Sequence, residues 1–244
     1  QVVFQQGRSR IAAETAHFMN AIGSNTILNH RALCSLNKRA ANYISLGETD
    51  WESVDAENCK YFLNFGSNFY EAHQGGFHLL KRVIKARYDH GAKLVTFDVR
   101  LSNTAGRSDN WFAPFPGTEG AIALGMAHVI MNAGQYDKEF LEKWTNYSPE
   151  KLIAWLKPYT PEWAAKLSGL DAKDIGRVAL EFAAQRPAVA AFTNRGSMAH
   201  YNGLNNDRAV IMLNAIVGSI GRVGGYCYGE LEKLDNAIFP PPEP

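Results

Sequence analysis

The feature that most constrains the fold is a regular alternation of short apolar runs with segments of helical periodicity. Residues 59–65 predict a buried strand, residues 73–89 a helix and residues 93–98 a second strand. The alternation returns later, with a strand over 188–193 and a helix over 207–217. Strands that alternate with helices predict an α/β fold, in which a parallel, Rossmann-like sheet carries helices on both faces.

Composition excludes several classes of protein. The 244 residues carry a formal net charge of +1, so no broad electrostatic field points to nucleic acid or an anionic membrane. No apolar run reaches the ~20 residues that a membrane span needs. The chain begins with Gln1 and ends in the proline-rich stretch 239–244, so we expect a fragment or a processed chain. The lack of a targeting signal then says little about location.

Polar loops follow three of the predicted strands, after Phe65, Phe97 and Thr193. In parallel sheets, ligands bind beyond the carboxyl ends of the strands, so these loops predict a binding site. A full GxGxxG fingerprint is absent from the first turn. Asp98 ends its strand and has two interpretations: a hydrogen-bond acceptor for a ribose or a base, or a turn residue. Its position in a βαβ unit favours the first.

Cys34 lies in the stretch 27–41, where a polar turn leads into helix-forming residues. A cysteine at a helix start, with Arg31 and Lys38 nearby in sequence, favours the thiolate, which attacks electrophiles or binds metals. The alternative is a buried, inert cysteine. The three cysteines form no CxxC pair, so neither a zinc site nor a cluster-binding run is visible. His128 lies in an apolar helical segment, and we interpret it as a hydrogen-bonded core histidine.

Six pieces of the sequence together resemble the molybdopterin oxidoreductases of the dimethyl sulfoxide reductase family. Their order and spacing fit over almost the whole chain. They are residues 33–35, 65–68, 97–100, 116–120 with 127–130, Gly196 with 200–203, and 220–225.

The resemblance implies an α/β Rossmann-like molybdopterin-dinucleotide-binding domain over 30–232. Residues 1–29 would end a preceding α/β domain, and 233–244 would be a linker. It also implies a bis(molybdopterin guanine dinucleotide) cofactor with molybdenum or tungsten. Cys34 matches the position of the protein's metal ligand, and a thiolate is a soft ligand suited to such an ion. A 4Fe-4S cluster is expected in the missing amino-terminal part.

The resemblance also assigns cofactor-binding residues. Family members often carry aspartate or asparagine where Glu119 stands, which departs from the pattern. The implied contacts are Asn68 and Glu71 to one guanine dinucleotide, Asp98 and Arg100 to its ribose or phosphate, Gly117 and Glu119 to its guanine end, and Gly196, His200 and Asn202 to the second pterin.

Formate dehydrogenases of this family carry histidine directly after the metal ligand, and Ser35 stands there in this chain. We therefore expect a respiratory enzyme that acts on a sulfur or arsenic oxyanion or polysulfide and is linked to quinone. Partners would be an iron–sulfur electron-transfer subunit and a membrane quinone-interacting subunit, at the periplasmic or outer face of the cytoplasmic membrane. One alternative is a metal-free electron-relay homologue in a quinone reductase complex. Another is a plain nucleotide-binding or interaction domain.

Overall fold

The computed structural model describes residues 2–7, 11–30, 34–47, 52–72 and 76–228. The chain divides into two compact units, Asn37–Gly229 and Gln1–Leu36, the latter grouped with Glu230–Pro244. The larger unit thus begins at Asn37, and the domain boundary expected at residue 30 stays a prediction. The expected linker over 233–244 lies outside the described residues.

The smaller unit contains a βαβ arrangement. Strand β1 (Phe4–Gln6) pairs in parallel with β2 (Ile27–Asn29), and helix α1 (Ala12–Ala21) connects them. The helix is followed by Gly23 at a φ of 74°, a left-handed backbone conformation that favours glycine.

The larger unit is built on a four-stranded parallel sheet with the order β6-β5-β4-β7. Its strands are β4 (Tyr61–Phe65), β5 (Lys93–Phe97), β6 (Asn110–Phe112) and β7 (Val189–Thr193). Every residue of β4 and β7 is buried. Strands of a parallel sheet that is covered on both faces carry such continuous apolar runs. The predicted fold class is confirmed.

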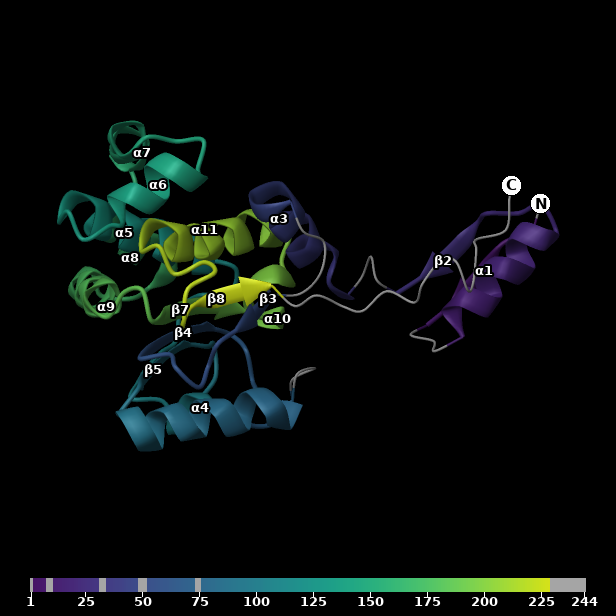
Figure 1. The fold of residues 1–244 in the computed structure, drawn as a ribbon, viewed down its shortest axis with the longest axis horizontal. Coiled ribbons are helices and arrows are strands. Elements are labelled where there is room, and N and C mark those ends of the chain that lie inside the picture. Colours follow the sequence, from purple (N-terminus) through teal and green to yellow (C-terminus); the bar gives the residue numbers. More distant parts are fainter. Residues whose placement is uncertain (1, 8–10, 31–33, 48–51, 73–75, 229–244) are drawn as a thin grey trace. The chain divides into compact units, whose positions relative to one another are not determined.

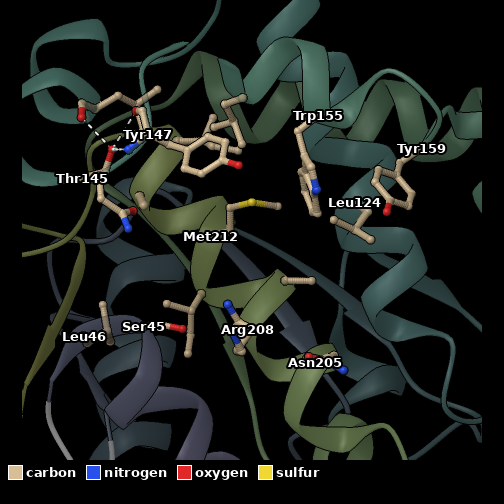
Figure 2. Close-up of a pocket in the computed structure, with 17 residues that line it drawn as sticks. Ser45, Leu46, Leu124, Thr145, Tyr147, Trp155, Tyr159, Asn205, Arg208 and Met212 are labelled. Atoms are coloured by element: carbon tan, nitrogen blue, oxygen red, sulfur yellow. Dashed lines mark hydrogen bonds between the residues drawn. The ribbon is translucent and has the colours of Figure 1, made fainter. Parts of the chain in front are cut away.

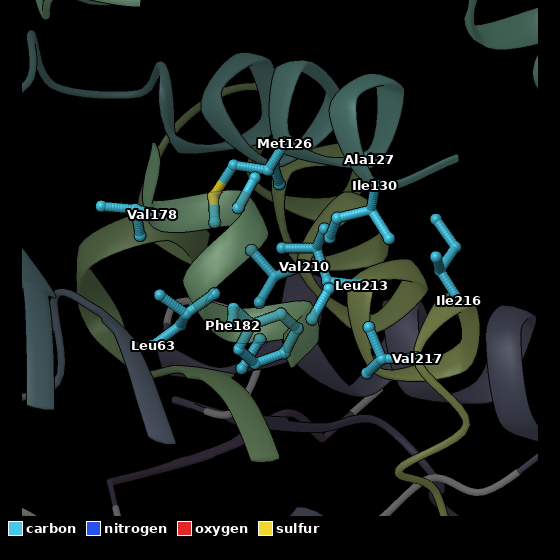
Figure 3. Close-up of a cluster of buried hydrophobic side chains, with 14 of the residues drawn as sticks. Leu63, Met126, Ala127, Ile130, Val178, Phe182, Val210, Leu213, Ile216 and Val217 are labelled. Atoms are coloured by element: carbon cyan, nitrogen blue, oxygen red, sulfur yellow. The ribbon is translucent and has the colours of Figure 1, made fainter. Parts of the chain in front are cut away.

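Helices cover both faces of this sheet (Figure 1). Helix α4 (Gly76–His90) packs on one face, where Val83 joins Phe62 and Leu94 in a buried cluster. Helices α5 (Glu119–Asn132), α9 (Ala172–Ala184) and α11 (Gly203–Ile216) supply the larger core on the other face. Figure 3 shows Phe182 of α9 beside Val210 and Leu213 of α11 in that core.

Shorter elements complete the larger unit. These elements are α3 (Leu36–Leu46), β3 (Glu52–Val54) antiparallel to β8 (Tyr226–Tyr228), the 3-10 turn η1 (Ala105–Arg107), α6 (Lys138–Trp144), α7 (Pro149–Leu156), α8 (Pro161–Ser168) and α10 (Arg195–Met198). Among the described residues, side chains cap the N-termini of α6, α7, α8 and α9. Thr160 Oγ1, for example, accepts a hydrogen bond from Trp163 N, and Pro161 is the first residue of that helix.

One local expectation was wrong. The stretch 194–203 was expected to be a polar loop, yet it contains α10, and α11 begins at Gly203 rather than Asp207. The reason is that Asn206 and Asp207 are buried polar residues, which hide the apolar periodicity of the first helical turn. His128 is half-buried, and its Nδ1 lies 3.0 Å from the Leu156 carbonyl oxygen, which fits a structural role. Within the described ranges, no helix has the length and apolarity to cross a membrane.

Candidate functional site

The carboxyl ends of three strands meet at one edge of the sheet. Because β4, β5 and β7 run parallel and in register, Phe65 lies beside both Phe97 and Thr193. The three polar segments that follow these residues, the third of which contains α10, therefore begin side by side at this edge, as the sequence predicts. A cleft of ≈ 710 Å³ opens there, and it is lined by Gly66, Asn68, Glu71, Ala72, Arg100, Asn194 and Arg195.

Three of the predicted site residues line this cleft together. Arg100 Nη2 donates a hydrogen bond to Glu71 Oε1 at 2.8 Å, and Asn103 Nδ2 donates to Glu71 Oε2 at 3.0 Å. Asn68 lies on the β4 loop, and its Oδ1 is buried without a hydrogen-bond partner in the described structure. A buried acceptor without a partner is costly, so this oxygen fits a ligand that donates a hydrogen bond.

Asp98 is placed differently from its neighbours. Its carboxylate accepts hydrogen bonds from Ser102 Oγ at 2.9 Å and from Arg100 N at 3.4 Å, and the residue is only 8% exposed. Asp98 does not line the cleft but stabilises the loop that presents Arg100 to it. Of the two interpretations of Asp98, this geometry matches that of a turn residue. The expected contact between Asp98 and a ribose or phosphate stays a prediction.

The backbone approaches itself closely beside the cleft. A Cβ atom added at Gly196 would lie 2.5 Å from Gly66 Cα, and Gly66 has a φ of 71°. Only glycine at both positions allows the β4 and β7 loops to lie this close. Gly196 was expected near a second pterin, and the structure places it against the loop that carries Asn68.

A second group of predicted residues comes together at the start of α5. The His200 ring packs on Gly117, since a Cβ added there would lie 3.3 Å from His200 Cγ. Glu119 is only 3% exposed, and its Oε2 has no hydrogen-bond partner in the described structure. Asn206 Nδ2 of α11 donates to the Gly117 carbonyl at 3.2 Å, which ties α11 to this turn.

Burial shifts the protonation equilibrium of Glu119. It raises the pKa of the Glu119 carboxyl, and the nearby Asp207 carboxylate raises it further. Backbone hydrogen bonds at the start of α5 and the His200 ring act in the opposite direction without cancelling the effect. The carboxyl is therefore biased toward the neutral form, which both donates and accepts hydrogen bonds.

Two predicted residues, Asn202 and Cys34, remain. Asn202 is exposed before α11, where its Oδ1 accepts a hydrogen bond from Asn205 Nδ2 at 2.8 Å. Cys34 is half-buried and belongs to the smaller unit; it was expected in a turn before a helix, yet it is itself helical and is separated from α3 by the turn residue Ser35. Burial raises the pKa of Cys59 to about 12 and also raises that of Cys227. Those two thiols are not biased toward the thiolate.

Sequence reasoning missed several residues of this edge. Asn194 and Arg195 line the cleft directly after β7, and their position in the polar loop beyond Thr193 was the available signal. Lys38 was noted only as a charge, yet it is buried, and its Nζ donates to Thr193 O at 3.0 Å and Thr193 Oγ1 at 2.8 Å. Asp207, whose carboxylate accepts from Ser197 Oγ, gave no local signal.

The fold and the cleft define a class. A parallel α/β sheet whose strand ends carry asparagines, arginines and tightly packed glycines is typical of proteins that bind dinucleotides and related phosphate-bearing cofactors. The chain belongs to the molybdopterin oxidoreductase family, whose family model matches residues 2–236.

Several known proteins are similar to the chain. The thiosulfate reductase molybdopterin-containing subunit PhsA of Salmonella typhimurium is 31% identical over 92% of the chain and 29% of its own length. The arsenate respiratory reductase subunit ArrA of Shewanella sp. is 30% identical over 88% of the chain and 28% of its own length. The solved structure of acetylene hydratase from Pelobacter acetylenicus superposes with a TM-score of 0.76 at 26% identity, over 93% of this chain and 31% of that one. The chain thus spans less than a third of these proteins.

The residues of the cleft fit part of a molybdopterin guanine dinucleotide. Asn68 Oδ1 is an acceptor in need of a donor, and Arg100 offers N–H groups beyond the one that binds Glu71. The close approach of Gly66 and Gly196 brings the segments after β4 and β7 together beside these side chains. Amide oxygens suit the donors of a guanine or pterin, and arginine suits a diphosphate.

Proposed function

We propose that this chain is the dinucleotide-binding part of the catalytic subunit of a respiratory molybdenum or tungsten oxidoreductase. Its substrate would be a sulfur or arsenic oxyanion or polysulfide, and electrons would be exchanged with quinone through an iron–sulfur subunit and a membrane subunit. The site would face the periplasm or the outer side of the cytoplasmic membrane. The observation that carries the proposal is the match over 92% of the chain to a thiosulfate reductase subunit.

The residues of the chain would hold and orient the cofactor. Arg100, fixed by Glu71, would contact a diphosphate or ribose, and Asn68 would accept a hydrogen bond from the dinucleotide. Glu119 and His200 would contact cofactor groups near Gly117. Cys34 would bind the metal through sulfur. When bound, the group would supply two-electron redox chemistry and oxygen- or sulfur-atom transfer.

Replacement of Cys34 tests the proposal in the full-length enzyme. We expect Cys34→Ser to retain the pterin with sharply lower turnover, because a hard oxygen replaces a soft sulfur at the metal. We expect Cys34→Ala to abolish turnover. Metal content, pterin content and reductase activity toward thiosulfate, polysulfide and arsenate are measured on the same preparations.

Cys227→Ser is the matched control, since Cys227 is also half-buried. It should retain metal, pterin and activity. Wild-type turnover in Cys34→Ala would contradict the ligand assignment. A wild-type enzyme that contains neither metal nor pterin would favour an electron-relay homologue instead.

A further inference from the structure

A groove lined by aromatic and apolar side chains runs between α3, α7 and α11. Its volume is ≈ 630 Å³, and it shares no lining residue with the cofactor cleft. Figure 2 shows Trp155, Tyr159 and Tyr147 on one side and Met212 and Arg208 of α11 on the other. The rings of Trp155 and Tyr159 pack with centroids 5.1 Å apart, so this wall is preformed. We call this the aromatic groove.

The aromatic groove leaves large side chains partly uncovered. Trp155 and Tyr147 are each 44% exposed. A second hollow of ≈ 920 Å³ continues the groove and adds Trp144, which is 68% exposed, and Ile44, which is 55% exposed. Exposed aromatic and apolar side chains that gather around a hollow are typical of places where another protein segment binds. The residues shared by the two hollows are Ser45, Leu46, Thr145, Asn146 and Ala215.

The charges around the two hollows are mostly positive. Arg208, Lys143 and Arg222 line them, against the single acid Glu139. Arg208 is exposed, and within the described structure its guanidinium has neither a hydrogen bond nor an ion pair. Tryptophan, tyrosine, methionine and arginine are the residues enriched in the centres of interfaces. The surface therefore suits an apolar segment that carries a carboxylate.

We infer that the aromatic groove is covered by a segment of the same catalytic polypeptide, from outside residues 1–244, with an aspartate or glutamate opposite Arg208. The chain spans only 28–29% of the thiosulfate and arsenate reductase subunits to which it is similar, so most of such a polypeptide lies beyond these residues. An apolar, aromatic surface is also typical of a permanent interface rather than a transient one. The inference rests on family membership and is independent of which substrate the enzyme reduces.

Photocrosslinking in the full-length enzyme tests the inference. With p-benzoylphenylalanine at position 155, irradiation should give an intrachain crosslink, and mass spectrometry should map it outside residues 1–244 to a peptide with an acidic residue. The same probe at Tyr88, which is 90% exposed on α4, is the control for random capture. Crosslinks only to another subunit, to a second copy or to residues 1–36, or no crosslink at all, would overturn the inference.

The carboxylate is tested separately by charge reversal at Arg208. In the position-155 background, Arg208→Glu should lower the crosslink yield severalfold, because like charges would then face each other. Lys166→Glu on α8 makes the same charge change at an exposed site outside the groove and should leave the yield unchanged. Arg208→Gln gives a milder version in case the reversed variant does not fold. An unchanged yield in both Arg208 variants would refute the acidic contact.

Discussion

At the scale of single residues, the buried Glu119 carboxyl makes the stability of the folded protein depend on pH. Burial raises its pKa above the ordinary 4.5, so the folded protein holds the proton more tightly than the unfolded chain. The associated stabilisation is therefore complete below pH 4.5 and is lost as the pH rises through the folded pKa. An amide at this position has no such dependence.

We predict that Glu119→Gln stabilises the cofactor-free full-length protein at pH 8 by on the order of 1 kcal/mol, and has little effect near pH 4.5. Thermal midpoints of both proteins across this pH range provide the measurement. Glu139→Gln, on the exposed side of α6, serves as the control. An equal shift of the midpoint at both pH values would show that the Glu119 carboxyl does not titrate as described.

Arg100 is the residue by which the cofactor cleft itself is tested. We predict that Arg100→Leu lowers the fraction of enzyme with bound pterin severalfold while stability changes by less than about 1 kcal/mol. Arg177→Leu is matched to it, because Arg177 also loses exposed ion pairs, on α9 and away from the cleft. Pterin fluorescence per mole of protein is compared. If both variants lose the pterin equally, Arg100 has no specific role in binding.

At the scale of elements, α3 is attached to the sheet by its first turns. Asn37 Nδ2 donates to the Met198 carbonyl at 2.9 Å, and the buried Lys38 ammonium binds Thr193 at the end of β7. The helix that follows Cys34 is therefore fixed to the strand end that carries Asn194 and Arg195. Long-range polar contacts, rather than helix propensity, position this element.

Lys38→Met should therefore release α3. The methionine side chain keeps the apolar part of lysine but cannot donate to the two Thr193 oxygens. We expect the free energy of unfolding to fall by about 1–3 kcal/mol. Hydrogen exchange should speed up over Leu36–Leu46 while β4 stays protected. Lys173→Met on the exposed face of α9 should change neither quantity. Unchanged exchange in α3 would mean that the Lys38–Thr193 bonds do not hold this helix.

At the scale of the whole larger unit, the buried Asn214 joins its helical layer to its sheet. The Asn214 amide donates a hydrogen bond to Ala191 O and accepts one from Ala191 N, both at 2.8 Å. These are backbone groups of β7 that point away from β4, its neighbour in the sheet. A side chain of α11 thus takes the place of a neighbouring strand at Ala191. Backbone groups buried in this way must be paired for the fold to be stable.

We predict that Asn214→Leu lowers the free energy of unfolding by about 2–5 kcal/mol, because it leaves two backbone groups of Ala191 buried without partners. Met212→Leu, a volume-conserving change two residues away on α11, should cost less than about 1.5 kcal/mol. Denaturant unfolding of both variants provides the comparison. Similar losses would indicate that packing, and not the amide pairing, decides the effect.

Local sequence determined the central strands β4, β5 and β7, the larger helices and their order, because apolar periodicity and capping residues act over a few positions. Thr160 before Pro161 starts a helix, and the polar loops after Phe65, Phe97 and Thr193 meet at one edge, since parallel strands end together. Tertiary structure alone decided the contacts between distant residues. The Asp98 carboxylate accepts a hydrogen bond from Ser102 within its own loop, and Glu119 is buried near His200. The Asn214 side chain bonds to the backbone of Ala191 in β7, which lies 23 residues earlier in the chain. Such contacts depend on which buried polar groups come within hydrogen-bond distance after packing, and no short-range pattern encodes that.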